Sequence, residues 1–246
     1  MGVGVILEFD LGNTAAKWRL LQGVELIERG RVSDLASLVM PPEASIDAVR
    51  VASVAGEVRE QALSQWCRDS LGLEARFARS TTVCAGVTNA YAEPERLGVD
   101  RWLAVLAAYH QFPQGALVVD AGTALTVDMV DARGRHLGGY ILPGHHLMQN
   151  SLRQDTARVY YTESDRPELR PGQSTAEAVV NGAALAATAV ATAALAQARE
   201  QLGADCAALL TGGDAELLMQ LLGEKAGDFA YSPDLVMEGL ALACPE

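Results

Sequence analysis

The chain is poor in cysteine, in basic residues and in runs of like charge. Its four cysteines, Cys67, Cys84, Cys206 and Cys244, lie far apart and form no CxxC pair, which favours reduced, mostly buried thiols over a disulfide framework. With 19 basic and 31 acidic residues the formal net charge is −12. Because binding to nucleic acid or to an anionic membrane needs clustered lysine and arginine, we expect neither as a partner.

Two further absences bear on where the protein works. No secretory leader precedes the first apolar run, so we expect a cytoplasmic protein. The uncharged stretch 178–198 is about long enough to span a bilayer, but it consists mainly of alanine and threonine and contains Asn181 and Gly182. We therefore expect a helix that packs closely against another element, either in the core or at a dimer interface, and no membrane span.

The common nucleotide-binding signatures are also missing, since nothing matches GxxxxGK followed by Ser or Thr, and no protein-kinase set is present. Instead, two apolar runs each end in an Asp-x-Gly turn, Asp10-Leu11-Gly12-Asn13-Thr14 and Asp120-Ala121-Gly122-Thr123-Ala124. One such turn alone is more simply a hairpin. Two at equivalent positions favour a duplicated fold that handles phosphate, and a third turn, Thr211-Gly212-Gly213-Asp214, could hold adenine or ribose.

The order of expected elements repeats once along the chain. The first half predicts strands near 4–10, 15–22 and 23–31, a helix near 33–40, a strand near 47–53, a helix near 58–71 and a strand near 74–79. The second half predicts strands near 115–120, 124–130 and 136–142, helices near 145–153 and 174–202, a strand at 207–211 and a helix at 214–222. We expect an α/β fold of two RNase-H-like domains, 1–112 and 113–246, with mixed sheets flanked by helices.

The side chains at these turns suit chemistry on a nucleoside triphosphate, which needs donors around the phosphates and a carboxylate for the cation. Asp10 and Asp120 supply carboxylates, and Gly12 and Gly122 let the backbone approach closely. The remaining candidates are hydrogen-bond donors and one positive charge: Asn13, Thr14, Thr123 and Lys17.

At this point the ordered motifs resemble those of the type III pantothenate kinase family. They are DLGNT with Lys17-Trp18, Gly98-Val99-Asp100-Arg101, DAGTA at 120–124, Gly138 to Ile141 with Pro143-Gly144, and TGGDAELL at 211–218. The resemblance implies an actin/hexokinase-like homodimer that uses ATP to phosphorylate pantothenate, the first step of coenzyme A synthesis. It also implies a monovalent cation, potassium or ammonium, and magnesium with ATP.

The resemblance assigns roles to individual residues. Asp100 would be the catalytic base, Asp120 would bind the monovalent cation, and Asp10 would bind magnesium, directly or through water. The ATP contacts would be Asp10, Leu11, Gly12, Asn13, Thr14, Ala15, Ala16, Lys17 and Thr123. The pantothenate contacts would be Tyr91, Gly98, Val99, Asp100, Arg101 and Thr175. One departure is that Ser174 and Asn181 stand where the family usually has Asn and Ser, which bears on the contact at Thr175.

Simpler interpretations stand beside these. Asp100 could stabilise a helix dipole, Arg101 could pair with Glu95 rather than with the pantothenate carboxylate, and Tyr91 could belong to the core. For the whole protein, one alternative is a non-catalytic regulatory or accessory relative. It is disfavoured because the three motif aspartates, Asp10, Asp100 and Asp120, are all present. The other is an actin-like kinase for a different small hydroxyl substrate, which would leave Gly98 to Arg101 without a role.

Overall fold

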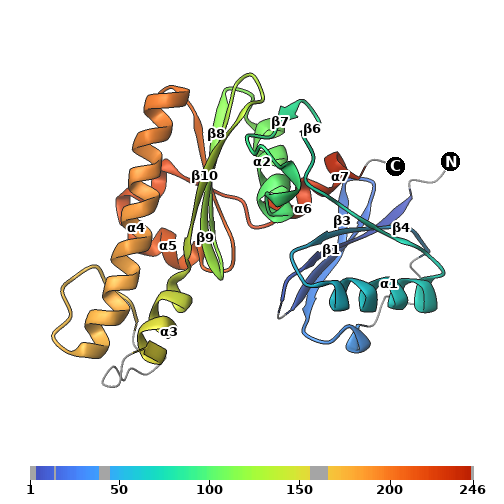
Figure 1. Cartoon of the computed structure of the whole chain (residues 1–246), viewed down its shortest axis with the longest axis horizontal. Helices are drawn as coiled ribbons and strands as arrows, with labels where there is room; N and C mark the ends of the chain where they lie inside the picture. The colour runs from blue at the N-terminus through green and yellow to red at the C-terminus, as the bar shows by residue number, and fades with distance from the viewer. Residues whose placement is uncertain (1–3, 14, 39–44, 156–165, 245–246) are drawn as a thin grey trace. The chain divides into compact units, whose positions relative to one another are not determined.

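The computed structural model of the chain describes residues 4–13, 15–38, 45–155 and 166–244. The chain forms two compact units (Figure 1). The first contains Met1–Gly86, Tyr91–Ala107 and Leu235–Glu246, and the second contains Val87–Ala90 and Ala108–Asp234. Helix α2 (Val99–Gln111) therefore begins in the first unit and ends in the second.

The first unit is built on a five-stranded sheet in the order β3-β2-β1-β4-β5. Its strands are β1 (Val5–Leu11), β2 (Ala16–Gln22), β3 (Glu25–Val32), β4 (Ile46–Ser53) and β5 (Ala75–Phe77). The first three strands are antiparallel, and β4 and β5 run parallel to β1. Helix α1 (Glu57–Leu71) packs on β4 and β5, while α6 (Leu235–Glu238) contacts β1 and α7 (Leu240–Ala243) contacts β4.

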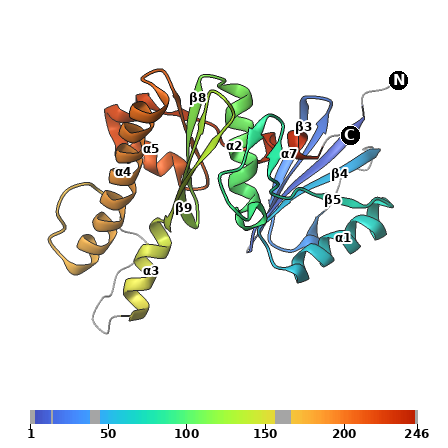
Figure 2. The ribbon, with the colours of Figure 1, turned by 45° about the horizontal axis from the view of Figure 1, so that its top comes forward.

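The second unit repeats this plan in a sheet of order β10-β9-β8-β11-β12. Its strands are β8 (Gly115–Ala121), β9 (Ala124–Asp131), β10 (His136–Pro143), β11 (Ala207–Thr211) and β12 (Ala230–Tyr231). Its helices are α3 (His145–Asp155), α4 (Thr175–Leu202) and α5 (Ala215–Leu222), followed by the 3-10 helix η3 (Gly223–Asp228). Helices α4 and α5 both pack on β8 and cover one face of the sheet (Figures 1 and 2).

Identical strand orders confirm the predicted duplicated α/β fold with mixed sheets. The two copies differ between their third and fourth strands. There the second unit inserts α3 and the 28-residue α4, whereas the first has only the 3-10 turn η1 (Leu35–Ser37) among its described residues. The short helix predicted near 33–40 is therefore present in its described part only as this single 3-10 turn, and residues 39 and 40 lie outside the described residues.

The boundary between the halves also differs from the predicted one at 112/113. The units divide within α2 at Ala107/Ala108, and the chain returns to the first unit at Leu235. The return is fixed by close packing, because the Cα of Gly239 lies directly against the backbone of Leu103. The order of elements along the sequence does not show that the C-terminal segment packs in the first unit. They also missed the two-residue strand β12, the 3-10 turn η2 (Pro94–Arg96), and the short ribbon of β6 (Val83–Cys84) and β7 (Val87–Thr88).

Helix α4 begins with a modified capping box. Ser174 Oγ accepts a hydrogen bond from the Glu177 amide at 3.2 Å, but Glu177 Oε2 accepts from the amide of Gln173 rather than from that of Ser174. The helix is long and apolar enough to cross a membrane, with a mean hydropathy of 1.7 over an 18-residue window. Half of that window is buried inside the protein. A stripe of alanines faces the core of its own sheet: Ala187, Ala191, Ala194 and Ala198.

Candidate active site

The first Asp-x-Gly turn joins β1 to β2 in the first unit. Asp10 lies directly opposite Lys17 in the antiparallel register, and the Gly12 amide donates to the Ala15 carbonyl at 3.0 Å. Leu11 and Ala16 are fully buried and hold the two strand ends in the core, whereas Asn13 is exposed. Thr14 lies outside the residues that the structure describes. The turn therefore presents polar groups on a rigid hairpin.

The carboxyl group of Asp10 has an unusual environment. Burial raises its pKa, the positive charge of Lys17 lowers it, and the negative charge of Asp100 raises it again, with a net upward shift. Asp10 and Asp100 come from separate segments, and this electrostatic interaction brings two of the predicted site residues together within one unit. A carboxyl group whose pKa is raised and that lies near a second acid is a common feature of sites that bind cations or move protons.

Asp100 lies in the first turn of α2, next to Gly98. Its Oδ1 accepts a hydrogen bond from the backbone amide of Arg101 at 2.8 Å. A Cβ atom added to Gly98 would lie 2.6 Å from the same oxygen. Any larger residue at Gly98 would therefore displace the carboxylate, which explains why this position must be glycine if the orientation of Asp100 matters.

Arg101 and Tyr91 form a second contact in the same unit. Arg101 Nη1 donates to the Tyr91 hydroxyl at 3.0 Å, and the guanidinium carbon lies 5.8 Å from the centre of the tyrosine ring. Arg101 is 6% exposed, so its charge is held in a largely desolvated position. Glu95, the alternative partner, is exposed and makes no ion pair among the described residues. Val99 is also buried.

The second turn joins β8 to β9 in the second unit and is tied to two glycine-containing segments. The Gly122 amide donates to Ala124 O at 3.0 Å, which parallels the Gly12 bond, and the Gly144 amide donates to Thr123 O at 2.9 Å. Gly144 lies so close to the carbonyls of Gly122 and Thr123 that a side chain would not fit. The turn, the end of β10 and the start of α3 are therefore fixed together.

The third turn follows β11 and meets the second turn. Gly212 has φ +97° and lies against both the Asp120 carboxylate and the Ala121 carbonyl, leaving no room for a Cβ. The Asp214 amide donates to the same Ala121 carbonyl at 2.8 Å. The Asp120 carboxylate and the Ala121 carbonyl thus lie close together beside Gly212. Oxygen ligands of these two kinds are the ones that a hard monovalent cation prefers. Among the described residues no group of three or more His, Cys, Asp and Glu side chains could hold a metal ion.

A hollow that is open to solvent lies beside these turns within the second unit. Its polar edge includes Gly122, Gly144 and Asp214, and its apolar wall includes Leu217 and Leu221 of α5. His145 also lines it; burial, followed by the neighbouring His146, lowers its pKa. Its Nε2 lies 2.7 Å from Gln149 Nε2, and its buried Nδ1 has no hydrogen-bond partner in the part of the chain that the structure describes.

One predicted residue is not joined to these groups. Thr175 is exposed in the first turn of α4, and its side chain makes no hydrogen bond among residues with a described position. Thr123, in contrast, is part of the second turn through its carbonyl. The structure therefore groups the predicted residues into a cluster around Asp10 and Asp100 in the first unit and one around Asp120 in the second.

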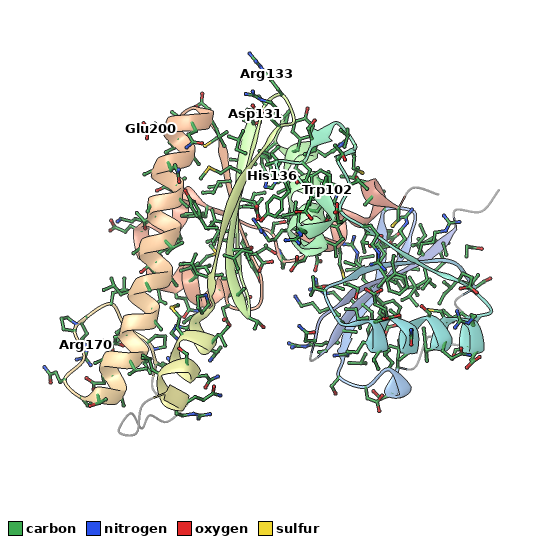
Figure 3. The ribbon with its side chains drawn as sticks, viewed as in Figure 1. Trp102, Asp131, Arg133, His136, Arg170 and Glu200 are labelled. Atoms are coloured by element: carbon green, nitrogen blue, oxygen red, sulfur yellow. The ribbon has the colours of Figure 1, made fainter. Side chains whose placement is uncertain are left out.

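Sequence reasoning missed a buried pair on the second sheet. His136 Nε2 lies 2.9 Å from Asp128 Oδ1, both side chains are almost fully buried, and the Ala90 amide donates to His136 Nδ1 at 3.4 Å. Figure 3 shows His136 on β10, below the exposed turn that carries Asp131 and Arg133. Since Ala90 directly precedes Tyr91, the pair anchors the chain where it leaves the second unit. The available signal was Asp128, a charged residue between the apolar Val127 and Met129 of β9.

Comparison with known proteins connects these clusters to one family. The family model described as type III pantothenate kinase matches residues 6–198. A type III pantothenate kinase of Pseudomonas aeruginosa strain LESB58 is 41% identical over 251 residues, which cover 98% of this chain and 99% of the relative.

Solved structures agree on the fold. A conserved putative Baf family transcriptional activator from Campylobacter jejuni has a TM-score of 0.60 at 20% identity, covering 95% of this chain and 94% of that one. A putative 2-dehydro-3-deoxygalactonokinase from Sinorhizobium meliloti has a TM-score of 0.54 at 13% identity, with 97% of each chain covered. At these identities the likeness extends to the fold alone.

Proposed function

The chain belongs to the type III pantothenate kinase family and phosphorylates pantothenate with ATP in coenzyme A biosynthesis, and on that premise we propose roles for its residues. The observation that carries the proposal is the electrostatic coupling of Asp10 and Asp100 within one unit. Two acids with different surroundings can divide the work of binding the phosphate-bound cation and of moving a proton.

Asp100 acts as the general base. Its carboxylate takes the proton of the primary hydroxyl of pantothenate as that oxygen forms a bond to the γ-phosphorus, and the bond to the β,γ-bridging oxygen breaks to release ADP. The support is its position in the first turn of α2, with Oδ1 oriented by the Arg101 amide and with Gly98 leaving space beside it.

The first turn binds the phosphates of ATP. Backbone groups from Leu11 to Ala16 approach the phosphate oxygens, Lys17 adds a positive charge, and Asp10 binds the magnesium ion that arrives with ATP, directly or through water. The raised pKa of Asp10 fits this role, because a cation beside the carboxylate would favour its ionised form.

The second unit supplies a cation and a nucleotide site. Asp120 and the neighbouring backbone carbonyls would hold potassium or ammonium, which offsets negative charge on the transferring phosphoryl group. Their close packing around Gly212 and Gly144 supports this assignment. Thr123 contacts a phosphate, and the hollow lined by Leu217 and Leu221 takes the adenosine end of ATP.

Arg101 binds the carboxylate of pantothenate, and Tyr91 holds the guanidinium in place. A desolvated arginine suits a carboxylate because its planar fork can donate two parallel hydrogen bonds. The support is the burial of Arg101 and the hydrogen bond that its Nη1 donates to the Tyr91 hydroxyl at 3.0 Å. Gly98 and Val99 complete the contacts to pantothenate, and Thr175 is a further contact of the same substrate.

We also propose a cytoplasmic homodimer. The second unit exposes large apolar side chains on β10 and α4, including Tyr140, Ile141 and Leu185, which a second copy would cover. Gel filtration tests this, because a monomer would elute at the mass of one 26.0 kDa chain.

A coupled ADP-release assay tests the function as a whole. The protein is offered pantothenate, a panel of sugars and a panel of small hydroxy acids, each with magnesium, ATP and potassium. Pantothenate alone should support turnover. Turnover with a sugar instead would favour an actin-like kinase of other specificity, and no turnover with any acceptor would favour a non-catalytic accessory protein.

A further inference from the structure

Arg59 of helix α1 contacts the first Asp-x-Gly turn, between β1 and β2. No motif or spacing in the sequence predicts this contact. Helix α1 begins just after β4, whose end pairs in parallel with the end of β1, and the Val54 amide donates to Leu11 O at 3.2 Å. The start of the helix therefore adjoins the turn. From there Arg59 Nη1 donates a hydrogen bond to the backbone carbonyl of Asn13, 46 residues away in the chain.

Arg59 has no carboxylate partner among the described residues. The two acids in the same helical turn are engaged elsewhere, since Glu57 accepts from Gln61 at 3.0 Å and Glu60 pairs with Arg79 at 2.8 Å. Several other arginines among the described residues do form ion pairs with acids, among them Arg19, Arg50, Arg68, Arg135 and Arg199. The protein has a net charge of −12, yet the guanidinium of Arg59 contacts only the carbonyl of Asn13 in the first Asp-x-Gly turn. Its positive charge is therefore not matched by an anion among the described residues.

We propose that Arg59 is a phosphate-binding residue of the ATP site, an inference that rests on the proposed role of the first turn. One N–H holds the turn through Asn13 O, and the other donors of the guanidinium fork take oxygens of the ATP phosphates. Arginine suits this double task because it presents five donors in a fixed plane. The N-terminus of α1, where Gly56 provides no side-chain cap, adds backbone amides of the same polarity.

The test compares Arg59→Gln and Arg59→Lys with Arg68→Gln. Arg68 is a matched control on the same helix, half exposed and paired only with exposed groups. Steady-state kinetics are measured with ATP and pantothenate varied in turn, and calorimetry measures the binding of MgADP and of adenosine. Arg59→Gln should raise the KM for ATP and weaken MgADP binding by about tenfold or more, because a charge-assisted bond is lost. The KM for pantothenate and the affinity for adenosine should stay within twofold, and Arg59→Lys should recover part of the loss.

Two results would overturn the inference. One is an unchanged KM for ATP in Arg59→Gln, as in Arg68→Gln. The other is an equal loss of MgADP and adenosine binding, or of both substrates, which would mean that Arg59 only maintains the local fold. If the wild-type protein failed to phosphorylate pantothenate while Arg59→Gln still weakened MgADP binding selectively, the proposed function would fail and this inference would stand.

Discussion

The charge of Asp100 raises the pKa of Asp10, and it acts in the same direction as burial, which is the larger cause. Lys17, opposite Asp10 on the hairpin, lowers the pKa of Asp10 but does not offset these two causes. Such an arrangement costs stability in the absence of ligands and becomes favourable when a cation arrives with ATP.

The first prediction concerns the stability of Asp10→Asn. Because the pKa of Asp10 is raised, the folded protein binds the proton more tightly than the unfolded chain, so stability falls as pH rises from 3.8 through the folded-state pKa. Removing the charge should raise the melting temperature at pH 7 and abolish phosphoryl transfer. Thermal unfolding between pH 4 and 8 without nucleotide measures this, and the gain should shrink towards pH 4.

Asp131→Asn is the control with the opposite sign. Burial tends to raise the pKa of Asp131, but hydrogen bonds from Arg135 and Arg133 lower it overall, so its stabilisation is present above pH 3.8 and lost below. This variant should melt lower than the wild type at pH 7. An Asp10→Asn variant that also melted lower at pH 7 would contradict the account of the first turn.

The second prediction concerns Gly98→Ala. The added Cβ would lie 2.6 Å from Asp100 Oδ1, so the carboxylate must rotate away while the backbone stays in place. We expect kcat to fall about tenfold or more, since a small displacement of a catalytic group is costly, with little change in melting temperature. Gly227→Ala, where a Cβ would meet nothing within 4 Å, is the control and should keep the wild-type kcat. A Gly98→Ala enzyme within twofold of wild type would show that the orientation of Asp100 is unimportant.

The sequence predicted the features that depend on local pattern. The turns at Asp10 and Asp120 end apolar strands, and Ser174 with Glu177 marks the start of α4, so each could be located from neighbouring residues. Contacts between distant segments could not be predicted. Arg59 reaches Asn13 only because β4 returns beside β1, and the packing of Gly239 on Leu103 requires the chain to return to the first unit. The pairing of Asp128 with His136 likewise depends on the register of β9 and β10.

The third prediction concerns the monovalent cation. If Asp120 and the adjacent carbonyls bind potassium or ammonium, replacing potassium by sodium should lower kcat by about tenfold or more, since the smaller ion fits the same oxygens poorly. Asp120→Asn should be slow in both salts and nearly insensitive to the exchange. The measurement is initial rate at constant ionic strength. A wild-type enzyme equally active in sodium would remove the cation from the account.

The fourth prediction concerns the buried pair of His136 and Asp128. His136→Ala should lower the free energy of unfolding by about 2–5 kcal/mol, because Asp128 would be left as a buried acid without this partner. Urea denaturation measures the change. Arg135→Ala, which breaks the exposed pair with Asp131 on the same hairpin, should cost less than about 1 kcal/mol. Equal decreases in the free energy of unfolding of the two variants would mean that the buried pair stabilises the protein no more than the exposed pair does.

The most direct test of the central claim is the kcat of Asp100→Asn with pantothenate, ATP, magnesium and potassium. Asparagine preserves the shape of the side chain and its hydrogen bond from the Arg101 amide but cannot accept the substrate proton. We predict a folded protein with a near-normal KM for ATP and a kcat reduced by about 10²–10⁴-fold. Turnover at the wild-type rate would contradict the assignment of Asp100 as the base.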